Sequence, residues 1–132
     1  MFLTRLTTTA ALVGDGGALP FRDRCVDLVL LSQVAHHFAP TAIVRLLREC
    51  ARVARRAVIV ADLRRSPLAG LGWQVASRVL RFDPTTVRDG LTSVRRGFSV
   101  ESLGRLLRTA GLDAPVSRRP GARLVAVWRP AS

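Results

Sequence analysis

Polar side chains that could bind a ligand follow each of three apolar segments of the chain. The apolar segments span residues 10–14, 26–32 and 57–61. The polar groups that follow them are Asp15 with Gly16, Ser32 with Gln33, and Asp62 with Arg64. In layered α/β sheets, ligands bind beyond the carboxyl ends of the strands. If the three segments are strands of one sheet, their spacing predicts a binding site built from these three polar groups.

His36 and His37 form the second candidate for chemistry. Adjacent side chains diverge and do not make the i, i+4 pair that ligates metal on a helix, so we expect no metal site here. An imidazole titrates close to neutral pH, and one of the two would serve as a general base. The alternative is a strand-to-helix turn in which one histidine packs against Phe38. Both interpretations stay open.

The pattern of the chain predicts the elements that must position these residues. Residues 26–32 and 57–61 are almost continuously apolar, which is typical of strands buried on both faces. We expect helices from Pro40, over 68–82 and after Ser99, an irregular segment over 83–98, a turn over 118–121 and a last strand at 124–128. Apolar strands alternating with helices predict a three-layer α/β fold with a largely parallel sheet.

Composition and charge exclude several classes of function. The formal net charge is +12, but all 21 basic residues are Arg and they are dispersed along the chain. Nucleic-acid binders cluster their basic residues and interleave aromatic ones, so the dispersion argues against that function. No apolar run is long enough to span a membrane. Cys25 and Cys50 are expected to be buried, reduced thiols of a cytoplasmic protein.

Several motifs together resemble the class I S-adenosylmethionine-dependent methyltransferases. The resemblance covers about residues 10–130, and it depends on the order and spacing of the motifs rather than on any single one. The residues that carry it are Gly14-Asp15, Leu19-Pro20-Phe21, Asp23, Asp27, His36-His37-Phe38, and the segments 49–62 and 97–112.

The resemblance implies roles for individual residues. Asp15 would accept a hydrogen bond from the adenine amino group of S-adenosylmethionine, and Gly16 would offer its backbone N–H to the ring. Ser32 and Gln33 would line the ribose and methionine region, and His36 or His37 would be the base for transfer to oxygen or nitrogen. For Asp15 the alternative is a turn-forming aspartate before two glycines.

The connection 64–98 is expected to select a small-molecule substrate. Trp73, Phe82 and the arginines at 64, 65, 95 and 96 would form an apolar pocket with a cationic rim, suited to an anionic or aromatic molecule. Alternatively, Trp73 and Phe82 are core contacts of a helix on the sheet. The substrate itself cannot be read from the sequence.

The glycine-rich cofactor loop of the family is not found in this sequence. We therefore expect residues 1–132 to form a single partial methyltransferase domain, truncated at its N-terminus, with the strand at 26–32 an exposed apolar edge prone to self-association. We expect the chain alone to bind S-adenosylmethionine weakly or not at all, and micromolar binding would refute this. The alternatives are a non-catalytic interaction protein that uses this edge and an Arg-rich nucleic-acid-binding protein.

Overall fold

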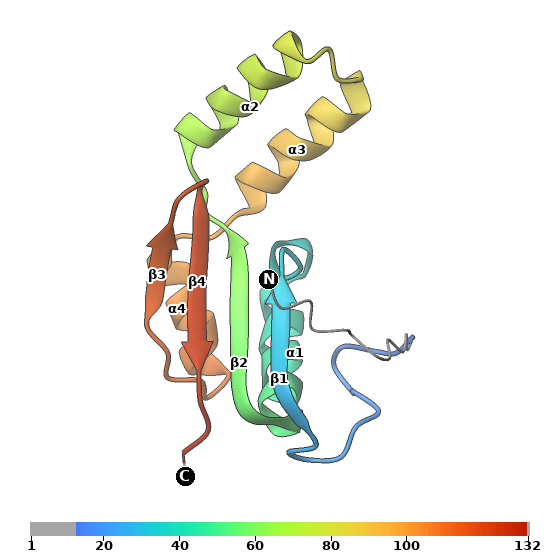
Figure 1. Cartoon of the computed structure of the whole chain (residues 1–132), viewed down its shortest axis with the longest axis vertical. Helices are drawn as coiled ribbons and strands as arrows, with labels where there is room; N and C mark the ends of the chain where they lie inside the picture. The colour runs from blue at the N-terminus through green and yellow to red at the C-terminus, as the bar shows by residue number, and fades with distance from the viewer. Residues whose placement is uncertain (1–12, 132) are drawn as a thin grey trace, which may run out of the picture.

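The computed structural model describes residues 13–131 and contains a four-stranded mixed sheet in the order β1-β2-β4-β3. β1 (Val26–Ser32) pairs in parallel with β2 (Ala54–Leu63), and β2 pairs antiparallel with β4 (Arg123–Trp128). β3 (Val116–Arg119) pairs antiparallel with β4. Figure 1 shows this layered arrangement and confirms the α/β class. The sheet is less parallel than expected, because β3 and β4 form a hairpin.

Two helices cover one face of the sheet and form the core with it. They are α1 (Pro40–Val53) and α4 (Val100–Thr109), both drawn behind the strands in Figure 1. Pro40 occupies the first turn of α1, where its missing N–H is not needed. At the start of α4, Ser99 and Ser102 form a reciprocal capping box. Each helix turns one apolar stripe toward the strands, so the two helices and the sheet share one hydrophobic core.

The opposite face of β1 is exposed. Leu28 and Leu30 on that face have exposed fractions of 57% and 63%, whereas Val29 and Leu31 pack against the core. The expectation that this strand is buried on both faces was therefore wrong. Among the described strands β1 also forms the sheet edge beside β2, as the sequence predicted.

A helical hairpin extends beyond the carboxyl ends of β1 and β2 (Figure 1). It consists of α2 (Pro67–Val79) and α3 (Pro84–Arg96). The prediction of an irregular segment over 83–98 was wrong, because Asp83 caps α3 and Pro84 begins it instead of breaking it. Trp73 packs against Phe82 at a ring-centroid distance of 5.7 Å, and its indole N–H donates to the Val87 carbonyl. These aromatic rings thus hold the hairpin together instead of packing on the sheet.

Three other expectations concern the ends of the chain and the cysteines. Residues 10–12 of the predicted first strand lie outside the described residues, and residues 13 and 14 form no strand. The predicted turn over 118–121 is shorter, because Arg118 and Arg119 belong to β3. Cys25 is exposed, contrary to expectation, and Cys50 is buried. Within residues 13–131, no helix is long and apolar enough to cross a membrane.

Candidate functional site

A tight turn after β1 positions the two histidines. Gln33 adopts a left-handed backbone conformation, with φ of 54°, and its N–H donates to the Ala61 carbonyl of β2. This conformation ends the strand and directs the chain over the end of β2. A short 3₁₀ helix, η1 (Ala35–His37), follows at once. Both histidines therefore stand at the carboxyl ends of β1 and β2.

Asp62 of β2 binds η1 and orients His36. Its carboxylate accepts hydrogen bonds from the backbone N–H of Ala35 at 2.8 Å and of His36 at 3.4 Å. His36 Nδ1 lies 2.6 Å from Asp62 Oδ1. Both side chains are almost completely buried, with exposed fractions of 3% for His36 and 1% for Asp62. The Leu63 N–H donates to Asp62 as well. One carboxylate thus holds the loop, the imidazole and the end of its own strand.

This pair is suited to proton transfer at the second ring nitrogen of His36. A carboxylate beside Nδ1 favours the tautomer in which Nδ1 carries the proton, so Nε2 is free to accept one. Nε2 has no hydrogen-bond partner among residues 13–131. The ring of His37 lies next to the ring of His36, and the two ring centroids are 4.0 Å apart. Asp62 hydrogen-bonds to the ring of His36 and not to that of His37, so His36 is the better candidate for the base.

A cavity of about 710 Å³ opens beside the two histidines. It lies between η1, the start of α1, the end of α3 and the first turns of α4. Its lining combines apolar groups with four arginines. Those residues are His36, His37, Phe38, Ala39, Pro40, Ile43, Arg65, Arg95, Arg96, Phe98, Ser102, Arg105 and Leu106. We call this space the basic cavity, since no carboxylate lines it.

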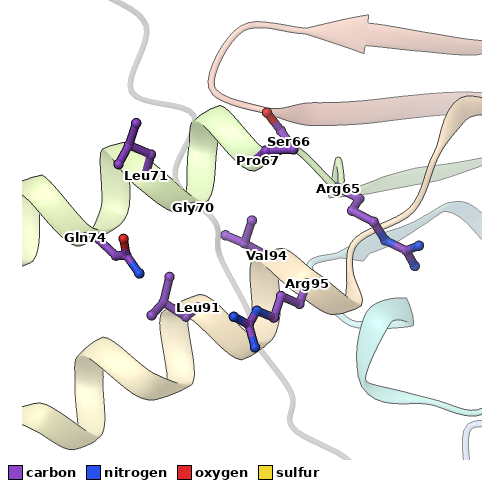
Figure 2. Close-up of a pocket in the computed structure, with 9 residues that line it drawn as sticks. All are labelled: Arg65, Ser66, Pro67, Gly70, Leu71, Gln74, Leu91, Val94 and Arg95. Atoms are coloured by element: carbon purple, nitrogen blue, oxygen red, sulfur yellow. The ribbon is translucent and has the colours of Figure 1, made fainter.

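A second cavity, of about 560 Å³, lies between α2 and α3 and adjoins the first. Figure 2 shows Gln74, Leu91 and Val94 directed into this gap, while Arg65 points away from it. Arg65 and Arg95 line both cavities. Of the residues expected to form an apolar pocket with a cationic rim, only Arg65 and Arg95 line this cavity, and Trp73, Phe82, Arg64 and Arg96 do not.

The segment that carries Asp15 and Gly16 is fastened to α1 by ionic contacts. Glu49 accepts the Leu19 N–H at 2.8 Å, and Arg52 donates to the Leu19 and Phe21 carbonyls and to Asp23. Hydrogen bonds from Arg52 and from the Leu19 backbone lower the pKa of Glu49 to about 2. The charged form of Glu49 is therefore part of what holds this segment in place.

Asp15 and Gly16 line a small cavity of about 80 Å³ together with Phe38, which also lines the basic cavity. One Asp15 oxygen accepts the Gly17 N–H at 2.8 Å, so this aspartate does form the turn considered as an alternative to cofactor binding. A Cβ at Gly16 would meet a Leu46 methyl at 3.0 Å. Phe38 thus lies between the predicted cofactor residues and the histidines.

Ser32 and Gln33 are exposed at the end of β1 and line neither the basic nor the small cavity. The structure brings His36 and His37 together with a residue that the sequence did not assign to catalysis, Asp62. Its signal in the sequence was its place at the end of an apolar strand, one of the three predicted polar groups. Its partner could not be read from the sequence, because the pair is separated by 26 residues.

A family model described as a methyltransferase domain matches residues 3–61, which include β1, η1, α1 and most of β2. A S-adenosylmethionine-dependent methyltransferase from Aquifex aeolicus matches with a TM-score of 0.63 and 15% identity, over 92% of this chain and 55% of that one. The chain has the class I S-adenosylmethionine-dependent methyltransferase fold. The family resemblance and the incomplete Rossmann-like sheet expected from the sequence are confirmed.

Two other solved structures share the methyltransferase fold. One is a S-adenosylmethionine-dependent methyltransferase from Thermotoga maritima, a possible histamine N-methyltransferase, with a TM-score of 0.62 and 20% identity over 91% of this chain and 63% of that one. The other is PigF with S-adenosylhomocysteine, with a TM-score of 0.58 and 18% identity over 89% of this chain and 33% of that one. The chain thus spans between 33% and 63% of the length of these three structures. No curated protein matches the sequence.

Proposed function

We propose that this chain provides the acceptor side of a S-adenosylmethionine-dependent methyltransferase, with His36 as the general base. The observation that carries the proposal is the buried His36–Asp62 pair, whose imidazole lines a cavity at the carboxyl ends of β1 and β2. The cavity volume, about 710 Å³, is within the range of small-molecule sites. The acceptor is therefore a small molecule that carries a hydroxyl or amine.

The residues around Asp15 fit one end of the cofactor. The second carboxylate oxygen of Asp15 is left to accept a hydrogen bond from an exocyclic amine. The adjoining cavity of about 80 Å³ admits only part of a ligand of that size. Ser32 and Gln33 are exposed at the neighbouring strand end, where they would contact the ribose and methionine region. With so few contacts, we expect the 132-residue chain to bind the cofactor weakly.

In this proposal the residues of the chain position the acceptor and accept its proton. When bound, S-adenosylmethionine supplies an electrophilic methyl group and leaves as S-adenosylhomocysteine. His36 takes the acceptor's proton at Nε2 as the new bond to oxygen or nitrogen forms and the bond from methyl to sulfur breaks. Asp62 stabilises the resulting imidazolium. Phe38 lines both cavities and thus separates the acceptor side from the cofactor side.

The test is methyl transfer from labelled S-adenosylmethionine, supplied at millimolar concentration because weak binding is expected, to a panel of small phenols, hydroxy acids and amines. Wild type is expected to label at least one acceptor, and His36→Gln is expected to lower the rate by about 10²–10⁴-fold, the usual share of a general base. His37→Gln is the matched control, because His37 lines the same cavity without contacting Asp62. Equal losses in the two variants, or no labelling by wild type, would overturn the proposal.

A second candidate function, docking of another polypeptide, is favoured by the exposed face and edge of β1. Leu28 and Leu30 expose more than half of their side chains beside an unpaired strand edge in the described sheet. A second copy of this chain is the simplest partner for such an edge. Sedimentation velocity over a range of concentrations tests this function. We expect self-association that Leu30→Lys abolishes, and a monomer at all concentrations would contradict it.

A further inference from the structure

The arginines of the basic cavity have no carboxylate to neutralise them. Arg65, Arg95, Arg96 and Arg105 come from three separate parts of the chain and line one space. Among the described residues none of them forms an ion pair, whereas Arg52 of α1 and Arg55 and Arg56 of β2 all do. The four cations are exposed, and their mutual repulsion is relieved only by water, salt or a bound anion.

The acidic residues of this protein are mostly engaged elsewhere. Asp62 holds His36, Asp83 caps α3, and Asp15 caps its own turn. The other paired carboxylates, Asp23, Asp27 and Glu49, bind arginines of α1 and β2. No carboxylate appears in the cavity lining. The lining therefore carries a positive charge that no carboxylate within it balances.

The lining of the basic cavity combines apolar groups with polar ones. Phe38, Ile43, Phe98 and Leu106 give it an apolar wall of a kind that accepts a ring or short alkyl chain. The positive end of the α4 dipole lies at the same rim, beside Ser102, whose hydroxyl is engaged with Ser99 in the cap of α4. Guanidinium groups donate in a planar fork that matches the two oxygens of a carboxylate or the oxygens of a phosphate.

We propose that the acceptor is an anionic small molecule, with its carboxylate or phosphate held by Arg95 and Arg105 and its apolar part against Phe38 and Phe98. This inference rests on the proposed function, because the same cavity contains the His36 base. The anion fixes the acceptor at one end, so that its hydroxyl or amine reaches His36 at the other. Arg65 and Arg95 also line the α2–α3 cavity, where a longer acceptor would extend along Leu91 and Val94.

Binding of two matched probes to the full chain tests the proposal by ¹H–¹⁵N NMR. The probes are 4-hydroxybenzoate and its neutral counterpart, 4-hydroxybenzyl alcohol. We expect the benzoate to shift the amide resonances of Phe38, Phe98 and Leu106 saturably, with an affinity at least about tenfold above that of the alcohol. Equal affinity for the two probes would overturn the proposal.

Charge-removing variants and inorganic phosphate complete the test. The double variant Arg95→Gln with Arg105→Gln is expected to lower benzoate affinity by about tenfold or more. Arg119 is an exposed residue of β3 outside the cavity, so Arg119→Gln is expected to leave the benzoate affinity unchanged. Phosphate that binds as tightly as the benzoate would show a simple anion patch and would also overturn the proposal. S-adenosylhomocysteine shifts of residues 15–17 report separately on the proposed function.

Discussion

Removing the Asp62 carboxylate is the perturbation whose cost follows most directly from the structure. Asp62 has a relative exposure of 1% and accepts three hydrogen bonds shorter than 3 Å, from His36 Nδ1 at 2.6 Å, Ala35 N at 2.8 Å and Leu63 N at 2.7 Å. In Asp62→Ala all three donors lose this acceptor in a buried setting. At a minimum of about 1 kcal/mol for each unsatisfied donor, the loss is about 3 kcal/mol.

Two further variants make this prediction specific. Asp62→Asn keeps the shape and one acceptor oxygen, so we expect a smaller loss, of about 1–2 kcal/mol. Asp27→Ala removes an exposed carboxylate that pairs with Arg55, and we expect a loss of less than about 1 kcal/mol. The assay is urea unfolding followed by circular dichroism, in which a loss of about 3 kcal/mol moves the midpoint by about 1–3 M. A midpoint for Asp62→Ala no lower than that for Asp27→Ala would refute the reasoning.

Three other predictions concern parts of the fold that support the site. Because the pKa of Glu49 is lowered to about 2, its contribution to stability is present above pH 4.5 and is lost as the pH falls toward 2; acid titration of the urea midpoint should show this loss in wild type and not in Glu49→Gln. Gly90→Ala places a methyl group in steric conflict with the facing Trp73 indole and should cost about 1–3 kcal/mol in thermal unfolding, whereas Gly72→Ala, in open space, should stabilise α2 by about 0.5–1 kcal/mol. Burial raises the pKa of the Cys50 thiol to about 11, so a thiol reagent at pH 8 should modify the exposed Cys25 rapidly and Cys50 only on unfolding.

Local sequence signals predicted those parts of the fold that local forces determine. Pro40 at the start of α1 and Ser99 at the cap of α4 were both visible as patterns. The α3 helix was missed because Pro84 and Gly90 look like breakers. In the structure Asp83 and Pro84 are a start signal, and Gly90 is required where the helix contacts Trp73.

For the candidate site, the sequence predicted which residues lie at the ends of strands, but not the contacts between residues of different strands. The sequence placed Asp62, His36 and Asp15 near strand ends, but not which of them meet. The His36–Asp62 contact depends on the parallel register of β1 and β2 and on the left-handed turn at Gln33, which no short pattern reveals. The exposure of Leu28 and Leu30 was likewise hidden, because an apolar run does not show which face is covered.

Binding of the methyl donor at this end of the sheet is tested most directly by a ¹H–¹⁵N NMR titration of the full chain with S-adenosylhomocysteine up to millimolar concentration. The chemical shifts report where the ligand binds even when affinity is weak. We expect saturable shifts at residues 15–17, at Ser32 and Gln33, and at Phe38, and we expect Asp15→Ala to abolish them. No shifts at millimolar ligand, or shifts confined to the α2–α3 hairpin, would contradict the claim that this end of the sheet binds the methyl donor.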